Sequence, residues 1–473
     1  EQKVDGVRAA TADAPPPEFS HTDSLLHSFQ PCTEQVISQL VRASPAKTCE
    51  LDPAPTFIIK EFADVLVPFL TRLCNASITE GCFPSSQKEA IVIPALKKHG
   101  LDPSDMKNYR PISNLRFTSK LVEKVVAAQM CTYLTTNDLW PKLQSGFRRF
   151  HSTESALLKV ISDIYAAIDI KDQVSLLALL DVSAAFDTVD SEILLQRLSV
   201  SFGVVGTACQ WFSSYLQGRV QTVRLGATRS VAAPVRCGVP QGSILGPLLY
   251  ILYTADVIPL VESCRCRVHL YADDTQLYDA GLASDFLSIA HRVVAAVEKV
   301  SAWMASNRLR LNQDKTQYIW FGTRPQLAKR DLQALAAVSP SLVSSASVKD
   351  LGVVLDSDMT FEAHISKLSQ TCFFQLRRLR TVRRSLSSAA LHSLIHSFIT
   401  TRLDFCNSAL YGSSAFLLQR LQSIQNAAAR LILNIPKFEH ISAAIRDSLH
   451  WLPIKKRIDF KLCLLVRNCL VGV

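Results

Sequence analysis

Acidic residues lie directly beside strongly apolar, strand-like segments at two places in the chain. The first segment runs from Leu177 to Asp181, and the second runs from Leu270 to Asp273 and Asp274. A carboxylate at the edge of a core strand is costly unless it is paired or binds a metal ion. Three carboxylates on two adjacent strands would repel one another, and two divalent cations would relieve that repulsion. The two segments therefore predict neighbouring core strands with a metal site at their ends.

Such a site suits phosphoryl transfer by two metal ions. One ion lowers the pKa of an attacking hydroxyl and the other neutralises a leaving pyrophosphate, with the ions roughly 3.5–4 Å apart. Hard oxygen ligands favour Mg²⁺, and Mn²⁺ would also suit them. Each segment alone has an ordinary interpretation, because a strand-end Asp is often a helix N-cap and two adjacent Asp residues are often a turn. Their combination favours the metal site.

Composition excludes several classes of protein and indicates a polyanionic partner. The chain has 473 residues, of which 48% are hydrophobic and 19% charged, so it is neither disordered nor a coiled coil. Its net charge is +10, yet residues 366–473 hold sixteen Lys and Arg against four Asp and Glu. This part carries +12 and the first 365 residues carry −2. The basic C-terminal quarter favours nucleic acid over an acidic membrane surface.

The sequence gives no reason to expect a membrane span or an exported protein. The apolar stretch Leu245–Val261 is broken by Pro247, Asp256 and Pro259, and no signal-peptide pattern follows Glu1. The thirteen Cys residues are scattered without C-x-x-C spacing, which favours reduced thiols in an intracellular protein of the nucleus, the cytoplasm or both. Because no Met opens the chain and its last residues read as helix, we expect a fragment.

Apolar periodicity divides the chain into helices and strands, which predicts the α+β class. Residues 1–20 have the composition of a linker, and helical spacing follows to about Cys82. The expected strands are Ala90–Pro94, Asn108–Ile112, Gln173–Leu180, Val220–Leu225, Val231–Cys237 and two strands within Val268–Tyr278. The expected helices are 119–137, 153–170, 284–306 and a basic helical region from His364 onwards.

Several motifs resemble those of one known family, and they occur in that family's order. The segment Tyr271-Ala-Asp-Asp274 resembles the Y-x-D-D box of reverse transcriptases, and Asp181-x-x-x-x-Phe186 resembles their first catalytic motif. Between them, the loop that starts at Gly238 resembles the family's G-x-P-Q-G-S motif. The segment from Trp303 to Thr316 resembles W-x-x-N-x-L-x-L-N-x-x-K-T. The nearest resemblance is to the polymerase of non-LTR (LINE-type, jockey-like) retrotransposons, and it covers almost the whole chain.

The resemblance implies a right-hand polymerase fold. Residues 1–85 would be an N-terminal linker and helical extension, and residues 86–175 the fingers. Residues 176–360 would form the catalytic palm, which contains an antiparallel sheet and interleaves with the fingers. Residues 361–473 would form a helical thumb with a basic, truncated C-terminal extension. Two departures from the family pattern, Ser191 after Asp190 and Thr254-Ala-Asp256, leave the three metal carboxylates in place.

The resemblance also implies roles for individual residues at the reaction site. Asp181, Asp273 and Asp274 would hold two Mg²⁺ ions. Phe186 would exclude the 2′-hydroxyl of a ribonucleotide, and Gln241 and Gly242 would support the template and the nascent pair. Nucleotide contacts are also expected from the basic residues Lys97, Lys98, Arg110 and Lys315. Lys315 is a candidate general acid for the leaving pyrophosphate, although a cation that caps a helix end would look the same.

Further basic residues are expected to contact nucleic acid. Arg148 and Arg149 lie in Gln144-Ser-Gly-Phe-Arg-Arg149, which resembles the motif that follows the fingers hairpin. A dense cluster follows in the thumb region: Arg377, Arg378, Arg380, Arg383 and Arg384. It would track the phosphates of an RNA–DNA duplex and release their counterions. The alternative is a solvated helix face, and the +12 charge of this region favours binding.

The sequence thus predicts an RNA-directed DNA polymerase that extends a primer 3′-hydroxyl. Its partners would be template RNA, a DNA primer and deoxynucleoside triphosphates, with no membrane involved and with no endonuclease domain in this chain. One alternative is a catalytically inactive, retrotransposon-derived nucleic-acid-binding protein, but the complete set of carboxylates argues against it. Another alternative is a related polymerase such as a maturase or telomerase. The LINE-like segments at 47–56 and 420–453 favour the retrotransposon enzyme over these.

Overall fold

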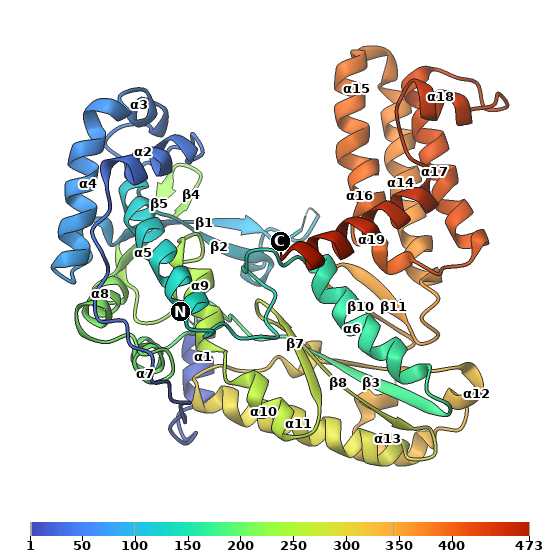
Figure 1. Cartoon of the computed structure of the whole chain (residues 1–473), viewed down its shortest axis with the longest axis horizontal. Coiled ribbons are helices and arrows are strands. Elements are labelled where there is room, and N and C mark those ends of the chain that lie inside the picture. Colours follow the sequence, from blue (N-terminus) through green and yellow to red (C-terminus); the bar gives the residue numbers. More distant parts are fainter. Residues whose placement is uncertain (1, 99, 344, 473) are drawn as a thin grey trace. The chain divides into compact units, whose positions relative to one another are not determined.

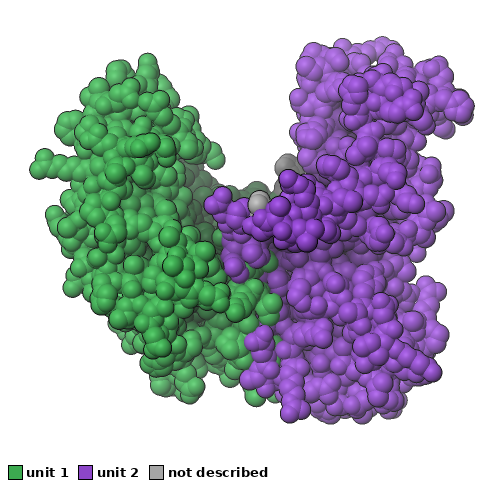
Figure 2. Space-filling view, in the orientation of Figure 1, with its two compact units in different colours: residues 1–147, 181–261, 298–312 green, residues 148–180, 262–297, 313–473 purple. Residues whose placement is uncertain are grey.

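The computed structural model of the chain describes residues 2–98, 100–343 and 345–472. The chain forms two compact units, and each is built from three separate stretches (Figure 2). Unit 1 contains residues 1–147, 181–261 and 298–312, and unit 2 contains residues 148–180, 262–297 and 313–473. Helices and sheets occur in both units (Figure 1), which confirms the predicted mixture of α and β structure.

Unit 1 combines a small sheet with helices. Its helices are α1 (Gln2–Ala10), α2 (Glu34–Ala43), α3 (Thr56–Glu61), α4 (Ala63–Thr79), α5 (Phe117–Thr136), α7 (Ser191–Val200), α8 (Gly206–Leu216), α9 (Leu245–Tyr253) and α10 (Val257–Ser263). Its strands are β1 (Glu89–Leu96), β2 (Tyr109–Asn114), β4 (Val220–Leu225), β5 (Thr228–Arg229) and β6 (Ala233–Pro234). The strand order is β2-β1-β4-β5, and β6 also pairs with β4. β1 runs antiparallel to β2 and parallel to β4.

An aromatic cluster fills the core of unit 1 where α8 meets the residues that precede β1. The ring of Phe83 contacts Trp211 at 5.6 Å and Tyr215 at 5.1 Å between centroids, both edge to face. Trp211 and Tyr215 lie one helical turn apart on α8 and stack on each other. All three side chains are buried. Large aromatic pairs of this kind contribute more than their buried area alone.

Two expectations for unit 1 are wrong. The predicted linker at residues 1–20 begins with helix α1, whose Val7 is buried and whose Arg8 donates to Asp190 at 2.9 Å. Contacts with distant residues thus stabilise a helix that has little apolar periodicity of its own. The expected strand Val231–Cys237 is reduced to the two residues of β6. Pro234 lacks the N–H that a continuing ladder would need.

Unit 2 contains an antiparallel sheet and a bundle of helices. Its strands are β3 (Gln173–Leu180), β7 (Arg267–Tyr271), β8 (Asp274–Leu282), β9 (Gln317–Phe321), β10 (Ser347–Asp350) and β11 (Val353–Asp356). Its helices are α6 (Thr153–Ile168), α12 (Arg324–Leu327), α13 (Leu332–Val338), α14 (Glu362–Thr381), α15 (Ser388–Ile395), α16 (Thr401–Asp404), α17 (Ala415–Leu433), α18 (Ser442–Asp447) and α19 (Ile454–Val471). Helix α11 (Phe286–Ser306) contributes residues to both units, and the last two residues of α10 also belong to unit 2.

The four-stranded sheet of unit 2 has the order β7-β8-β3-β9, and every pair is antiparallel. β3 lies inside the sheet and is almost entirely buried, as its continuous apolar run predicts. Helix α6 packs against β3 and β7 (Figure 1). Ser152 begins this helix with a capping box to Ser155. The expected bounds of β3 are confirmed, and so is the expected pair of strands around a tight turn, although β8 continues to Leu282, beyond the expected end at Tyr278.

Among the described residues, one stretch would be long and apolar enough to cross a membrane by length and composition alone. It is Leu245–Ser263, which comprises α9 and α10, and 67% of it is buried inside the fold. A buried core helix passes the same test.

Candidate active site

Asp273 and Asp274 lie at the turn of the β7–β8 hairpin in unit 2. Tyr271 pairs with Asp274, so Ala272 and Asp273 form a two-residue turn. Ala272 has φ +56°, a left-handed conformation that such hairpin turns require and that a residue with a side chain rarely adopts. Asp273 is half-buried and Asp274 is exposed. The hairpin therefore presents two adjacent carboxylates at its tip.

The register of β3 against β8 connects this turn to Asp181. Leu180, the last residue of β3, pairs with Thr275, which follows Asp274 on β8. Asp181 is the next residue in the chain after Leu180, and it belongs to unit 1. There the Asn312 backbone N–H donates to the Asp181 carbonyl at 2.8 Å, and the Asn312 amide donates to the Asp181 carboxylate at 3.3 Å. Asn312 thus anchors both the backbone and the side chain of Asp181.

Phe186 forms part of an aromatic stack in unit 1. Its ring lies 4.7 Å from that of Tyr250 on α9 in a stacked arrangement, and 6.4 Å from Phe147 edge to face. Tyr250 is buried, whereas Phe147 is 57% exposed. The Phe186 ring therefore packs against the buried ring of Tyr250 and borders the exposed ring of Phe147.

The loop from Gly238 to Gly242 is fixed to the segment that follows Asp181. The Gly238 N–H donates to the Val189 carbonyl at 2.7 Å, and the Gln241 side chain donates to the Asp187 carboxylate at 3.0 Å. Gly242 has φ +127°, and a Cβ there would lie 2.5 Å from the Ser113 carbonyl oxygen on β2. Glycine is thus required at position 242 because the loop backbone passes close to the backbone of β2.

Glu123, which the sequence patterns did not single out, lies beneath this loop. It is fully buried on α5, and its carboxylate accepts from the backbone N–H groups of Ile244 and Leu245 at 2.7 and 3.1 Å. Ser119 and Tyr215 also donate to it. Desolvation by burial raises the pKa of Glu123, while the donors from Leu245, Ile244 and Ser119 and the positive charge of Arg219 oppose the rise. The carboxylate caps the N-terminus of α9 and so positions Tyr250.

A second buried network in unit 1 joins α7 to Asp256, which precedes α10, and to Asn307, which follows α11. Arg197 on α7 is completely buried, forms an ion pair with Asp256 and donates to the Asn307 side-chain oxygen at 2.7 Å. Its guanidinium also lies 5.4 Å from the ring centre of Trp303. Trp303 and Asn307 are two residues of the motif that resembled the family's W-x-x-N segment. Their role here is to surround the buried Arg197.

The basic residues predicted to contact the nucleotide occupy different elements. Lys97 follows β1, where its backbone N–H donates to the Asn108 carbonyl, and Lys98 is exposed beside it. Arg110 is exposed on β2 opposite Ala95, so these three cations share the β1–β2 hairpin of unit 1. Lys315 is exposed in unit 2, in a short 3₁₀ turn before β9.

The arginines predicted to contact nucleic acid all lie in unit 2. Arg148 is half-buried, and Arg149 is exposed with its guanidinium 4.6 Å from the ring centre of Phe150. Arg377, Arg378, Arg380 and Arg384 are exposed along α14 and the turn after it. Arg383 differs, because it is half-buried and donates to the Leu431 carbonyl at 3.2 Å.

A further buried carboxylate lies near the hairpin tip in unit 2. Asp350 ends β10 and accepts from the Gln276 amide at 2.7 Å, two residues beyond Asp274 on β8. Burial raises the pKa of Asp350 to about 7, and the negative charge of Asp274 adds to the rise. Around neutral pH this carboxyl is therefore partly protonated.

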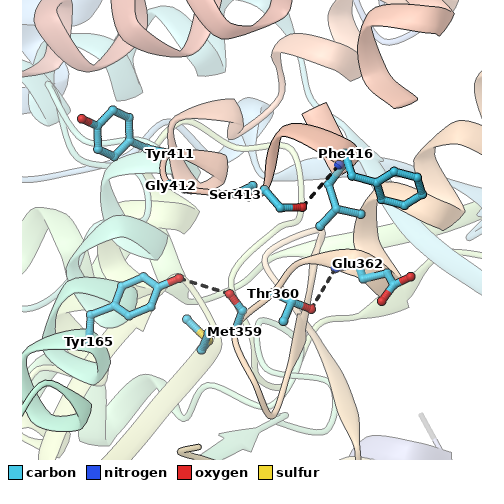
Figure 3. Close-up of a pocket in the computed structure, with 10 residues that line it drawn as sticks. Tyr165, Met359, Thr360, Glu362, Tyr411, Gly412, Ser413 and Phe416 are labelled. Carbon is cyan, nitrogen blue, oxygen red and sulfur yellow. Dashed lines mark hydrogen bonds between the residues drawn. The ribbon is translucent and has the colours of Figure 1, made fainter. Parts of the chain in front are cut away.

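One cavity is lined by none of the predicted site residues. It has a volume of about 650 Å³ and lies in unit 2, where the start of α14 faces the start of α17. Tyr165, Tyr411 and Phe416 supply aromatic walls and Glu362 supplies its charge (Figure 3). The Tyr165 hydroxyl donates to the Met359 carbonyl at 3.3 Å and so ties α6 to this wall.

The donor chemistry at the candidate site fits a hard divalent cation. Carboxylate oxygens are the ligands that Mg²⁺ and Mn²⁺ prefer, and the hairpin turn holds two of them side by side. Within the described ranges, no three His, Cys, Asp or Glu side chains already form a cluster that could hold a metal ion. The role of Asp181, Asp273 and Asp274 as a joint metal site thus stays a prediction.

Comparison with known proteins gives the class of the chain. Residues 96–355 match the family model described as reverse transcriptase (RNA-dependent DNA polymerase). The match covers more than half of the chain and contains both acidic motifs and the Gly238 loop. The chain therefore belongs to the reverse transcriptase family.

The relatives narrow this class to the mobile-element type that the motifs predicted. The chain is 27% identical, over 89% of its length, to the probable RNA-directed DNA polymerase from transposon BS of Drosophila melanogaster. It is 28% identical over 90% of its length to the corresponding protein of transposon X-element, and 26% over 82% to that of mobile element jockey, both from Drosophila melanogaster. The predicted resemblance to LINE-type, jockey-like reverse transcriptases is confirmed. The chain covers 47%, 46% and 42% of these relatives' lengths.

Proposed function

We propose that this chain is the polymerase part of a non-LTR retrotransposon protein and copies RNA into DNA. It would extend the 3′-hydroxyl of a DNA primer on template RNA with deoxynucleoside triphosphates. The observation that carries the proposal is the two-residue turn with Asp273 and Asp274 beside the end of β3, after which Asp181 follows. In this proposal residues 86–175 act as fingers, 176–360 as palm and 361–473 as thumb.

The three aspartates would hold two Mg²⁺ ions, which when bound would activate the primer hydroxyl and neutralise the leaving pyrophosphate. The chain's own residues would position the reactants. Asn312 keeps the Asp181 carboxylate in one orientation through its amide. The Phe186 ring, stacked on Tyr250, would press against the sugar and disfavour a 2′-hydroxyl. Such preorganisation lowers the barrier because reactants and charges need little rearrangement during the reaction.

The cations of the β1–β2 hairpin would hold the triphosphate. Arg110 presents a planar donor fork that suits phosphate oxygens, and Lys97 and Lys98 add positive charge on the same hairpin. Lys315 would protonate the leaving pyrophosphate from its turn before β9. Three cations on one hairpin suit a substrate that carries several phosphates.

Primer extension on an RNA template with Mg²⁺ and deoxynucleotides tests the proposal. The chain is compared with its Asp273→Asn, Asp274→Asn variant and with Asp169→Asn. Asp169 is exposed at the end of α6 in the same unit, so the last variant loses a negative charge away from the hairpin. We expect extension by the wild type and by Asp169→Asn, and loss of at least a thousandfold in the double variant.

Two results would overturn the assignment. Equal extension by the double variant would show that the hairpin carboxylates do not hold the reactive ions. No extension by the wild type, with duplex binding retained, would instead favour the retrotransposon-derived binding protein that keeps the fold without the reaction.

A further inference from the structure

Asp187 follows Phe186 in a tight turn of unit 1, and it is not among the residues predicted to hold the metal ions or the nucleotide. Its backbone N–H donates to the Ala184 carbonyl at 2.8 Å, and the Thr188 hydroxyl donates to the same carbonyl at 3.1 Å. Ala184 has φ +53°, a left-handed conformation that a residue with a side chain rarely adopts. The turn thus fixes the backbone of Asp187, whose side chain is half-buried.

Backbone hydrogen bonds hold the loop that starts at Gly238 against this turn. The Gly238 N–H donates to the Val189 carbonyl at 2.7 Å, and the Val239 N–H donates to the Phe186 carbonyl at 2.9 Å. These bonds use no side chain, so they should persist in a variant that lacks the Asp187 carboxylate. Such a variant should therefore keep the loop in place and release only what the carboxylate holds.

The Asp187 carboxylate holds the side chain of Gln241, whose amide nitrogen donates to it at 3.0 Å. Gln241 is fixed at its backbone as well, because its carbonyl accepts from the Ser113 N–H of β2 at 2.8 Å. The side chain of Gln241 is half-buried, so part of it remains accessible. Gln241 thus connects β2 to the turn that carries Phe186.

The carboxylate also decides which way round the Gln241 amide lies. A carboxylate only accepts hydrogen bonds, whereas the glutamine amide has an NH₂ group that donates and an oxygen that accepts. The NH₂ group must therefore face Asp187, and the amide oxygen is turned away from it. An asparagine at position 187 would not select one orientation, because its own amide can donate or accept.

We propose that Asp187 is a positioning residue, which orients the Gln241 amide so that its oxygen accepts a hydrogen bond from the nascent base pair. The inference rests on the proposed function, because it takes the expected contact between Gln241 and the nascent pair as given. Asp187 itself need not touch the substrate. A side chain that already has its binding orientation need not be ordered when the nucleotide binds, and this lowers the cost of binding.

Single-nucleotide primer extension with Mg²⁺ tests the proposal through kcat and KM for a deoxynucleotide. The variants of the full chain are Asp187→Ala, Asp187→Asn, Gln241→Ala and the double alanine variant, and circular dichroism verifies the fold of each. The matched control is Glu192→Gln, which removes a negative charge from an exposed position in the first turn of α7.

We expect Asp187→Ala to raise KM about tenfold, because a hydrogen bond to a charged group is worth about that factor or more. Its kcat should change less than about threefold, since the lost contact is made to the bound nucleotide before the reaction. Asp187→Asn should raise KM by about threefold, because only one of two amide orientations then fits. Glu192→Gln should change either constant less than about twofold.

The double variant shows whether Asp187 acts through Gln241. In the Gln241→Ala background, Asp187→Ala should change kcat/KM by less than about twofold, because the carboxylate then has no amide to orient. Losses that multiply would show that Asp187 acts independently of Gln241, and the proposal would be wrong. An Asp187→Asn variant equal to the wild type would likewise show that the carboxylate does not set the orientation.

A chain labelled with ¹⁵N-glutamine tests the positioning without the reaction. The side-chain amide signal of Gln241 is identified by its loss in Gln241→Ala, and its exchange with water is compared between the wild type and Asp187→Ala. We expect the exchange to be at least about fivefold slower in the wild type, while the backbone amides of residues 238–239 exchange equally in both.

This measurement separates the positioning from the polymerase reaction. Equal exchange of the Gln241 side-chain amide in the two proteins would overturn the proposal even if the chain polymerises. Slower exchange in a wild type that extends no primer would overturn the proposed function and leave the orientation of Gln241 by Asp187 in place.

Discussion

Replacing Arg197 with methionine should destabilise unit 1 by about 4 kcal/mol. The guanidinium has no exposed surface, and it binds the carboxylate of Asp256, whose side chain is 15% exposed. Methionine has a similar length and no charge, so the variant leaves the half-buried Asp256 carboxylate without its cationic partner, with only the hydrogen bond from the Ser20 hydroxyl remaining. Removing one partner of a buried ion pair costs about 3–5 kcal/mol for this reason. The lost donation to Asn307 contributes within that range.

Hydrogen exchange at the amides of α7 and of residues 298–306 of α11 measures the effect. Amides that exchange only when unit 1 opens should exchange about a thousandfold faster, since each 1.4 kcal/mol corresponds to a factor of ten. The matched control is Arg224→Met, which breaks an ion pair with Glu50 in the same unit. Both of those side chains are more than 40% exposed, so this loss should be at most about 1 kcal/mol.

A double variant tests the cause and not only the size of the effect. If an unpaired Asp256 carboxylate is responsible, then Arg197→Met with Asp256→Leu should recover at least half of the stability, because neither charge remains. Equal exchange in Arg197→Met and Arg224→Met would refute the reasoning. So would a double variant that is less stable than the single one, because lost packing would then outweigh the unpaired charge.

Two further predictions concern the aromatic stack and the buried histidine of β7. Tyr250→Leu removes the ring on which the Phe186 ring stacks. In single-nucleotide extension, the ratio of kcat/KM for a ribonucleotide to kcat/KM for the matching deoxynucleotide should therefore rise up to about tenfold. An unchanged ratio would show that the position of Phe186 does not depend on Tyr250. Burial lowers the pKa of His269 to about 4, so between pH 6.5 and 4 the unfolded chain binds a proton that the folded chain does not. The stability that His269 contributes is complete above pH 6.5 and should fall by about 3 kcal/mol at pH 4. Urea unfolding of the wild type and of His269→Gln, above pH 6.5 and at pH 4, checks this. A difference in unfolding free energy between the two proteins that is the same at both pH values would contradict it.

The local sequence pattern was sufficient to predict the strands that lie next to Asp181, Asp273 and Asp274. The apolar run before Asp181 predicted β3 with its observed bounds, and the alternation around Asp273 predicted the β7–β8 hairpin. Both features depend on neighbouring residues, because a buried strand needs a continuous apolar run and a hairpin turn needs a short polar break. The family motifs then identified the class, which the comparisons confirmed.

The supporting residues could not be predicted in the same way. Glu123 meets the N-terminus of α9 more than 120 residues later, and Arg197 meets Asn307 after 110 residues. Neither position has a local signal that distinguishes a buried network from an exposed helix face. Helix α1 was missed for the same reason, since its contact with Asp190 lies 182 residues away. Motif residues such as Asn312 were visible as a pattern, but their hydrogen bonds were not.

The division of each unit into three separate stretches affects how the chain is synthesised. Strand β3 lies inside its sheet, yet its first neighbour, β8, begins about ninety residues later and β9 follows later still. At about 5–20 residues per second, a ribosome needs about 5–20 s to supply that neighbour. During this interval an apolar strand leaves the ribosome with both of its hydrogen-bonding edges open. The nascent segment 173–180 therefore has no sheet neighbour until β8 has emerged, and no truncation of the gene to one contiguous stretch can produce either unit alone.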